Sequence, residues 1–326
     1  MKEIEKMMIS RATELLSSGE VNRVVGWKKG EFIHDPSPAT FETVESLKDF
    51  VYNDFCGANL SKYLIDISKK EGKTAVFLKP CDSYSFNELV KEHRIKRENV
   101  LVIAIECQGK IDPYKLATAG IDGVEEVAVN GREYTIKSMY GEKKLDKTMV
   151  LLERCLSCQK TEHAVADEKI IINEKQKGEL ERYMGVENLE KMTPEKRYNF
   201  WRDQLSKCIR CNACRNVCPA CSCIKCVFDN NASGIAAKAN DDVFEEQLFH
   251  VIRAYHVAGR CTDCGECSRV CPQRIPLHLL NRKFIKDINT LYGEYQAGES
   301  ADGKHPVIDY TTEDKDPTEA VYREGK

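Results

Sequence analysis

The carboxyl-terminal third of the chain carries the clearest chemical pattern, a repeated arrangement of cysteines. The chain has 326 residues and 16 cysteines, and the spacing CxxCxxCxxxCP occurs twice. This is the spacing of bacterial-type 4Fe-4S ligation, in which the fourth cysteine of each motif binds the other cluster. The predicted ligands are Cys208, Cys211, Cys214 and Cys271 for one cluster, and Cys261, Cys264, Cys267 and Cys218 for the other.

Zinc is the alternative metal for these eight thiolates. Zinc sites need only pairs of CxxC, so they leave the third and fourth cysteines and the prolines after them unexplained. We therefore expect iron and sulfur. Because thiolates cap every iron of such clusters, no coordination site remains for a substrate, and the module is expected to transfer electrons.

A second group of cysteines lies earlier in the chain. Cys155 and Cys158 form another CxxC. Taken alone, such a pair fits a redox dithiol, half of a zinc site or half of a cluster site. Cys81 and Cys107 each follow an apolar segment, and parallel strands there would bring both thiols to the edge at which α/β sheets bind ligands. Two interpretations stay open: a third 4Fe-4S cluster on all four thiols, or Cys81 and Cys107 as small buried hydrophobes.

Four further cysteines have no assigned partner. Cys221, Cys223 and Cys226 come directly after the first motif, and Cys56 is the one other thiol. They predict either a fourth metal site or thiols that pack beside the clusters and tune their potential.

The elements that must position these thiols are predicted from periodicity. The amino-terminal domain is expected to be α/β with a parallel βαβ core, because two continuous apolar segments flank a helical one. Asn130-Gly131 predicts the turn of a hairpin. The expected strands are 21–27, 31–34, 74–78, 100–105, 124–129 and 133–136, and the expected helices are 3–17, 44–52, 60–68, 84–93 and 243–257.

The chain is expected to divide into four parts. Residues 1–175 form the α/β domain, and 176–206 a helical linker. Residues 207–296 form the two-cluster domain, ferredoxin-like and α+β or irregular. Residues 297–326 form an acidic tail that is either disordered or wrapped around a partner.

Composition limits the function classes. Forty-nine basic and 52 acidic residues give a net charge of −3, so nothing indicates nucleic acid. The longest apolar run, 100–105, is too short to span a membrane, and the first residues lack a secretory signal, so a cytoplasmic location is expected. In that reducing compartment the thiols are expected to be buried, catalytic or bound to metal rather than to form disulfides. Neither a Rossmann fingerprint nor a P-loop occurs.

Three sequence blocks resemble a known family. KTAVFLKPCD, VLVIAIECQG and CLSCQKTEHAVADEKI are similar to blocks of the beta subunits of deazaflavin-reducing hydrogenase and formate dehydrogenase, iron-sulfur flavoproteins of anaerobes. The resemblance covers residues 20–175. It implies that Cys81, Cys107, Cys155 and Cys158 are cluster ligands near a flavin, FAD, and that Asn59 and Tyr63 surround the flavin or cluster.

The second motif, with PLHLL after it, resembles instead the small iron-sulfur subunit of heterodisulfide reductase. The cluster motifs also follow the α/β domain, whereas in the relatives they commonly precede it. Both features imply a wiring subunit of a larger redox complex, a hetero-oligomer with hydrogenase, formate dehydrogenase or heterodisulfide-reductase-like partners, or with a ferredoxin or flavoprotein. The alternative is an enzyme in its own right, an FAD-dependent oxidoreductase that reduces a deazaflavin-type carrier.

Overall fold

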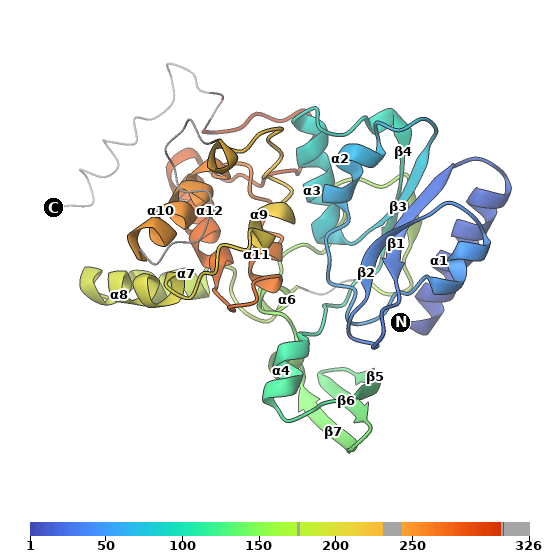
Figure 1. Ribbon diagram of the computed structural model, residues 1–326, viewed down its shortest axis with the longest axis horizontal. Coiled ribbons are helices and arrows are strands. Elements are labelled where there is room, and N and C mark those ends of the chain that lie inside the picture. Colours follow the sequence, from blue (N-terminus) through green and yellow to red (C-terminus); the bar gives the residue numbers. More distant parts are fainter. Residues whose placement is uncertain (175–176, 231–242, 308, 310–326) are drawn as a thin grey trace. The chain divides into compact units, whose positions relative to one another are not determined.

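The computed structural model describes residues 1–174, 177–230, 243–307 and 309. The chain forms two compact units (Figure 1). Unit 1 comprises residues 1–83 and 95–181, and unit 2 comprises residues 84–94 and 182–326. Unit 1 is an α/β structure, whereas the described part of unit 2 consists of helices and cysteine-rich loops.

Unit 1 is built on a five-stranded sheet of order β2-β1-β3-β4-β8. The strands β1, β3, β4 and β8 run parallel, and β2 pairs antiparallel with β1. Every residue of β3 and β4 is buried, as continuous apolar strands in a covered parallel sheet should be. The bounds are β1 Arg23–Lys28, β2 Ser37–Phe41, β3 Thr74–Leu78, β4 Val100–Ile105 and β8 Glu168–Ile170.

The α/β prediction is confirmed, and β3 and β4 lie where the sequence predicts them. The strand expected over 31–34 is wrong, because Asp35 accepts the Phe32 N–H (2.9 Å) and closes a turn there. The strand forms later, as β2. The expected helices 44–52 and 60–68 are shorter: η1 Glu45–Asp49, η2 Ser61–Tyr63 and α2 Leu64–Ile67.

Helix α1 buries Ile4, Met8, Ala12 and Leu15 along one face, the periodicity of an amphipathic helix. Helix α3 begins directly after β3, and its residues from Tyr84 onward belong to unit 2. The bounds are α1 Lys2–Ser17, α3 Pro80–Lys91, η3 Arg97–Asn99, α4 Pro113–Thr118, α5 Lys147–Val150 and α6 Glu153–Leu156.

A separate three-stranded sheet contains β5 Val124–Asn130, β6 Glu133–Ser138 and β7 Gly141–Asp146. The predicted hairpin is confirmed, with Gly131 at φ 60° in the turn. Strand β7 was not predicted, since its sequence is largely charged and exposed. Tyr134 and Ile136 of β6 pack on Val150 and Leu151, which fixes this sheet against the segment that precedes Cys155.

The described residues of unit 2 hold helices and loops but no strand. They therefore show the irregular character that was expected, without the strands of an α+β domain. Helix α10 packs on α8 and α12. The start of the acidic tail contacts α3, where the Lys91 Nζ donates to the Lys304 carbonyl (3.2 Å). The bounds are α7 Met184–Glu190, α8 Pro194–Leu205, α9 Ala213–Asn216, η4 Val227–Asp229, α10 Val243–His256, α11 Glu266–Arg269 and α12 Leu277–Tyr292.

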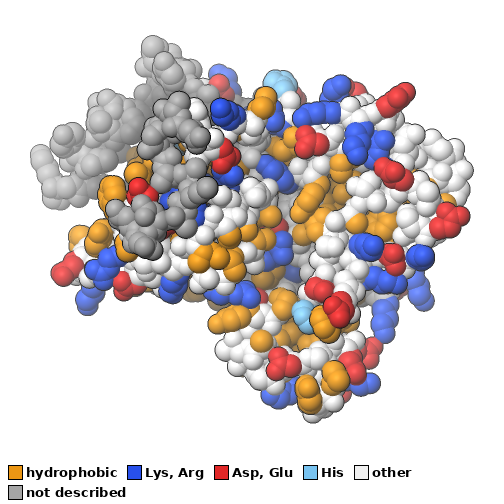
Figure 2. All heavy atoms as spheres, viewed as in Figure 1, with side chains coloured by type: hydrophobic (Ala, Val, Ile, Leu, Met, Phe, Trp, Pro, Cys, Tyr) orange, Lys and Arg blue, Asp and Glu red, His pale blue; other side chains and the backbone are white. Residues whose placement is uncertain are grey.

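Two surface properties bear on function. On the face drawn in Figure 2, Lys and Arg side chains are interspersed with Asp and Glu, so this face offers no broad field of one sign. None of the helices in the described residues has the length and apolarity that crossing a bilayer requires.

Candidate iron-sulfur centres

The two cysteine motifs of unit 2 have the same local backbone. Arg210 (φ 46°) and Asn212 (φ 61°) are left-handed in the first motif, and Asp263 (φ 60°) and Gly265 (φ 64°) are left-handed at the equivalent positions of the second. A one-turn helix follows in each, α9 and α11. Such turns are uncommon for non-glycine residues. Their repetition shows that the spacing dictates one loop conformation twice.

The fourth cysteines pack with the opposite motif. Cys271 lies in one apolar group with Cys214 and Cys267, and the partly buried Cys208 packs against the same group. Cys218 packs with Cys261 around Val257. Each fourth cysteine therefore lies near cysteines of the opposite motif, and the assignment of ligands to clusters stays a prediction. Cys211 is exposed and Cys264 is buried, and neither lies in these two apolar groups.

Burial makes these thiols poor acids when they hold no metal. It raises the pKa of Cys208 to about 12 and that of Cys267 to about 11. The pKa of Cys214 is also raised, first by burial and further by the nearby thiols of Cys271, Cys218 and Cys211. A bound cation would deprotonate such thiols outright, because thiolates are the metal-binding form.

Among the described residues, one further set of ligand-type atoms converges: the Cys208 thiol, the Glu246 carboxylate and the His250 ring lie within 4.8 Å of one another. The carboxylate is already engaged, however. Glu246 accepts from Arg210 Nε (2.9 Å) and Nη2 (3.1 Å), and both side chains are almost completely buried. We assign Glu246 to this ion pair rather than to a metal ion.

The sheet of unit 1 places Cys81 and Cys107 at equivalent positions beyond two neighbouring strands. Leu78 of β3 pairs with Ala104 of β4, and each thiol lies three residues beyond that pair, at the carboxyl edge. Cys81 is half-buried in the first turn of α3, and Cys107 is buried. The two strands therefore deliver both thiols to one edge, as their parallel direction predicts.

Backbone pairing brings the CxxC of unit 1 to Cys107. Leu152 N–H donates to the Lys110 carbonyl (2.9 Å), and Ile111 forms a bridge with Leu151. Between Cys107 and Lys110, Gly109 has φ 110°, and a Cβ built on it would lie 3.7 Å from the Cys155 Cβ. The loop that carries Cys107 therefore lies directly against Cys155.

Residues after the CxxC hold its turn in place. Gly178 N–H donates to the Cys158 carbonyl (2.7 Å), and Leu180 N–H donates to the Leu156 carbonyl (2.9 Å). A side chain at Gly178 would overlap the carbonyl oxygen of Leu156. This position needs glycine because two backbone segments approach each other closely.

Buried cations accompany this group of cysteines, and sequence reasoning missed them. Lys79 and Lys110 are each 1% exposed, and Arg154 and Lys160 are also buried. Lys79 pairs with Asp82 (2.7 Å), whereas Lys110 donates to the Asn53 carbonyl (2.8 Å) and lies over the Tyr52 ring. Buried positive charge needs negative charge nearby, which four thiolates would supply. The signal was available, since Lys79 and Lys110 adjoin the two Cys-bearing loops.

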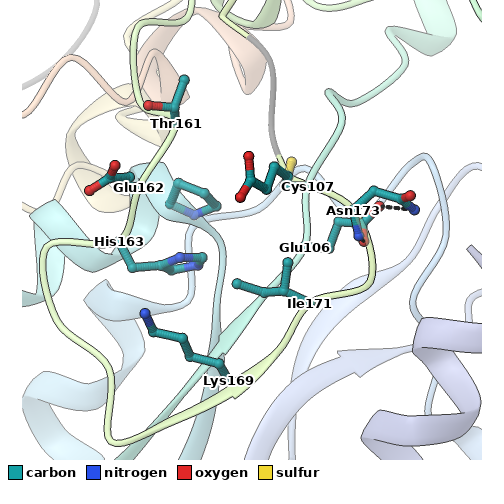
Figure 3. Close-up of a pocket in the computed structure, with 10 residues that line it drawn as sticks. Glu106, Cys107, Thr161, Glu162, His163, Lys169, Ile171 and Asn173 are labelled. Carbon is teal, nitrogen blue, oxygen red and sulfur yellow. Dashed lines mark hydrogen bonds between the residues drawn. The ribbon is translucent and has the colours of Figure 1, made fainter.

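A cavity of about 670 Å³ opens at the same edge of the sheet (Figure 3). Its wall is formed in part by the loop after β8, which Glu106 fixes by accepting the N–H groups of Ile172 (3.1 Å) and Asn173 (2.7 Å). This volume is within the range of small-molecule sites. The lining residues are Pro80, Glu106, Cys107, Thr161, Glu162, His163, Lys169, Ile171, Asn173 and Glu174.

Asn59 and Tyr63, the predicted surroundings of a flavin or cluster, are not among the residues that line this cavity. Asn59 is buried and accepts the Ser61 N–H (3.0 Å), whereas Tyr63 is 42% exposed. Their role stays a prediction.

The remaining cysteines fall in both units. Cys56 is fully buried in unit 1, where its thiol accepts the Asn53 N–H (3.3 Å) and burial raises its pKa to about 11. In unit 2, Cys221 borders the apolar group of Cys218 and Cys261, Cys223 is exposed and Cys226 is half-buried. A fourth metal site on these thiols stays a prediction.

Comparison with known proteins places these features in a family context. A family model described as "4Fe-4S dicluster domain" matches residues 204–275. The chain is 25% identical over 341 residues to the F420-dependent formate dehydrogenase subunit beta of Methanocaldococcus jannaschii, covering 85% of this chain and 88% of that protein.

Two further relatives are similar to the chain over different lengths. The F420-dependent formate dehydrogenase 1 subunit beta of Methanococcus maripaludis is 26% identical over 346 residues, covering 84% of this chain and 87% of that protein. Putative ferredoxin-3 of Sinorhizobium fredii is 34% identical over 79 residues, covering 24% of this chain and 75% of that protein.

Proposed function

We propose that this chain relays electrons inside a multi-subunit redox complex. The premise is that it is a homologue of the F420-dependent formate dehydrogenase beta subunits and carries a 4Fe-4S dicluster domain. It is an iron-sulfur electron-transfer subunit of the formate dehydrogenase and hydrogenase type. The observation that carries the proposal is the pair of equivalent left-handed loops, whose fourth cysteines pack with the opposite motif.

In unit 2 the proposed ligands are those that the spacing predicts. Cys208, Cys211, Cys214 and Cys271 would hold one cubane, and Cys261, Cys264, Cys267 and Cys218 the other. The packing of Cys271 with Cys208 and Cys214 supports this exchange. With every iron capped by a thiolate, such clusters accept and donate single electrons and do not bind a substrate.

In unit 1 we propose a third 4Fe-4S cluster on Cys81, Cys107, Cys155 and Cys158. The parallel register of β3 and β4, the contact of Gly109 with Cys155 and the four buried cations support it. The dicluster family model matches residues 204–275, within unit 2, so this third site rests on geometry and on the resemblance of the three sequence blocks.

The cavity beside Cys107 favours a second role. We propose that it receives a flavin-type group through which electrons reach a carrier, because the relatives are named for F420 and the cavity adjoins a proposed cluster ligand. Its lining includes hydrogen-bonding side chains and side chains of both charges, among them His163 and Lys169. Such a lining suits a polar heterocycle that carries an anionic chain.

The test is the iron, acid-labile sulfide, zinc and flavin content of the full chain, purified without oxygen. About twelve irons per chain are expected for three clusters, about eight for two and about sixteen if Cys56, Cys221, Cys223 and Cys226 bind a fourth. Stoichiometric flavin would support the role of the cavity, and its absence would refute it.

Substitutions then assign the ligands. Cys211→Ser and Cys264→Ser should each remove about four irons, and Cys107→Ser should remove another four. Cys56→Ser is the matched control, a buried thiol that hydrogen bonds within its own loop, and it should retain all the iron. Eight irons in both wild type and Cys107→Ser would refute the third cluster.

A further inference from the structure

Arg253 occupies an unusual position for a charged side chain. It lies on α10, on the same helical face as the buried residues Glu246, Phe249 and His250. Only 2% of Arg253 is exposed. A guanidinium cannot lose its charge in proteins, so this face brings a permanent cation into the interior of unit 2.

Its hydrogen-bonding groups find no acceptor among the described residues. Among the described residues, Nε, Nη1 and Nη2 of Arg253 have no hydrogen-bond partner. Arg210, another buried arginine of unit 2, contrasts with it, because two of its nitrogens bind the Glu246 carboxylate. A buried charge without partners is strongly destabilising, so the donors of Arg253 require acceptors beyond those that the described residues supply.

Cysteines from both motif regions, together with His250, lie close enough to Arg253 to interact with it electrostatically. Burial lowers the pKa of Arg253, but the thiols of Cys267, Cys214, Cys218 and Cys221 outweigh this and leave it raised. The influence is mutual, since burial raises the pKa of Cys214 and of Cys267 while Arg253 lowers both. Cys214 belongs to one proposed cluster, and Cys267 and Cys218 belong to the other.

We propose that Arg253 donates N–H···S hydrogen bonds to both ferredoxin-type clusters and raises the reduction potential of each. The inference rests on the proposed function, since it needs the clusters. Inorganic sulfide and thiolate sulfur are acceptors, and three unpartnered nitrogens in a planar fork can reach more than one of them.

The direction of the effect follows from charge. Reduction adds one negative charge to a cluster, and a fixed cation with N–H donors stabilises the reduced state more than the oxidised state. Arg253 is therefore a positioning residue for electron transfer. Because it faces ligands of both clusters, its removal should move both potentials in the same direction.

The experiment uses the full chain, purified anaerobically, with a potentiometric titration followed by electron paramagnetic resonance. In Arg253→Met the equilibrium constant for one-electron reduction of each unit 2 cluster should fall at least tenfold, a shift of 59 mV to lower potential. Iron content should stay that of wild type. Arg253→Lys, which keeps the charge but not the fork, should fall between the two.

Arg269→Met is the matched control. Arg269 lies in the second motif, but its N–H groups are engaged by Glu266 through Nε (2.7 Å) and Nη2 (2.9 Å), so its loss should move both potentials less than the loss of Arg253 does. Unchanged potentials in an iron-replete Arg253→Met variant would overturn the inference. So would an equal shift in Arg269→Met, which would indicate a general effect of charge.

A second measurement covers the case in which Arg253→Met loses its clusters. In wild type labelled with guanidino-¹⁵N arginine, the reduced clusters should show hyperfine coupling to ¹⁵N that is lost in Arg253→Lys. Iron-replete wild type without such coupling would overturn the inference and leave the proposed function intact. Wild type without any iron-sulfur signal would overturn the proposed function itself.

Discussion

The ion pair between Arg210 and Glu246 should control the stability of the first cysteine motif. Arg210 lies between Cys208 and Cys211, and Glu246 lies on α10, so the pair ties the loop to a helix. The exposed fractions of the two side chains are 1% and 3%, and the Arg210 guanidinium also lies 4.1 Å from the centre of the Phe249 ring. The perturbation is Glu246→Gln, which removes the negative charge and retains the size.

Removing one partner of a buried pair leaves an uncompensated charge and costs about 3–5 kcal/mol. For a protein of this size each kcal/mol lowers the melting temperature by about 2–4 °C, so Glu246→Gln should lower it by about 6–20 °C. Replacing both partners with apolar residues removes the unpaired charge as well. The double variant Arg210→Met with Glu246→Leu should therefore recover most of the loss.

The assay is the apparent melting temperature at one fixed scan rate, measured without oxygen, together with the iron retained per chain. Metal-bound proteins unfold irreversibly, so the comparison needs identical conditions. A drop below about 2 °C in Glu246→Gln would refute the assignment of this pair as an anchor. A double variant as unstable as the single one would show that shape, rather than unpaired charge, causes the loss.

Two further predictions concern a close backbone approach and pH. Gly178→Ala should displace the Cys155–Cys158 turn and remove about four irons per chain, whereas Gly303→Ala, whose added carbon would meet only contacts at 3.7 Å, should retain all of them. Burial, and then the neighbouring carboxylate of Glu92, raises the pKa of Glu88 from 4.5 to about 7, so the folded state holds this proton more tightly than the unfolded state. The resulting stabilisation is complete below about pH 4.5 and is lost as the pH rises through 7, so the melting temperature should fall more between about pH 5 and pH 8 in wild type than in Glu88→Gln. Equal slopes in the two proteins would contradict this.

Local patterns in the sequence determined much of this protein. The two cysteine motifs, the buried strands β3 and β4 and the hairpin at Asn130-Gly131 all follow from spacing, apolar continuity and turn chemistry. These features depend on residues close together in the chain, so a linear pattern is enough to predict them. The three blocks around Cys81, Cys107 and Cys155 likewise indicated the family.

Other features were decided only by the tertiary structure. The approach of the Cys107 loop to Cys155 depends on the backbone hydrogen bond between Leu152 and Lys110. The cavity depends on the loop after β8, which Glu106 fixes. The burial of the lysines and of Arg253 was not predicted, because a sequence pattern cannot say which helical face meets which thiols. Burial and electrostatic neighbours arise from segments far apart in the chain, and these set both the ion pairs and the burial of the Arg253 donors.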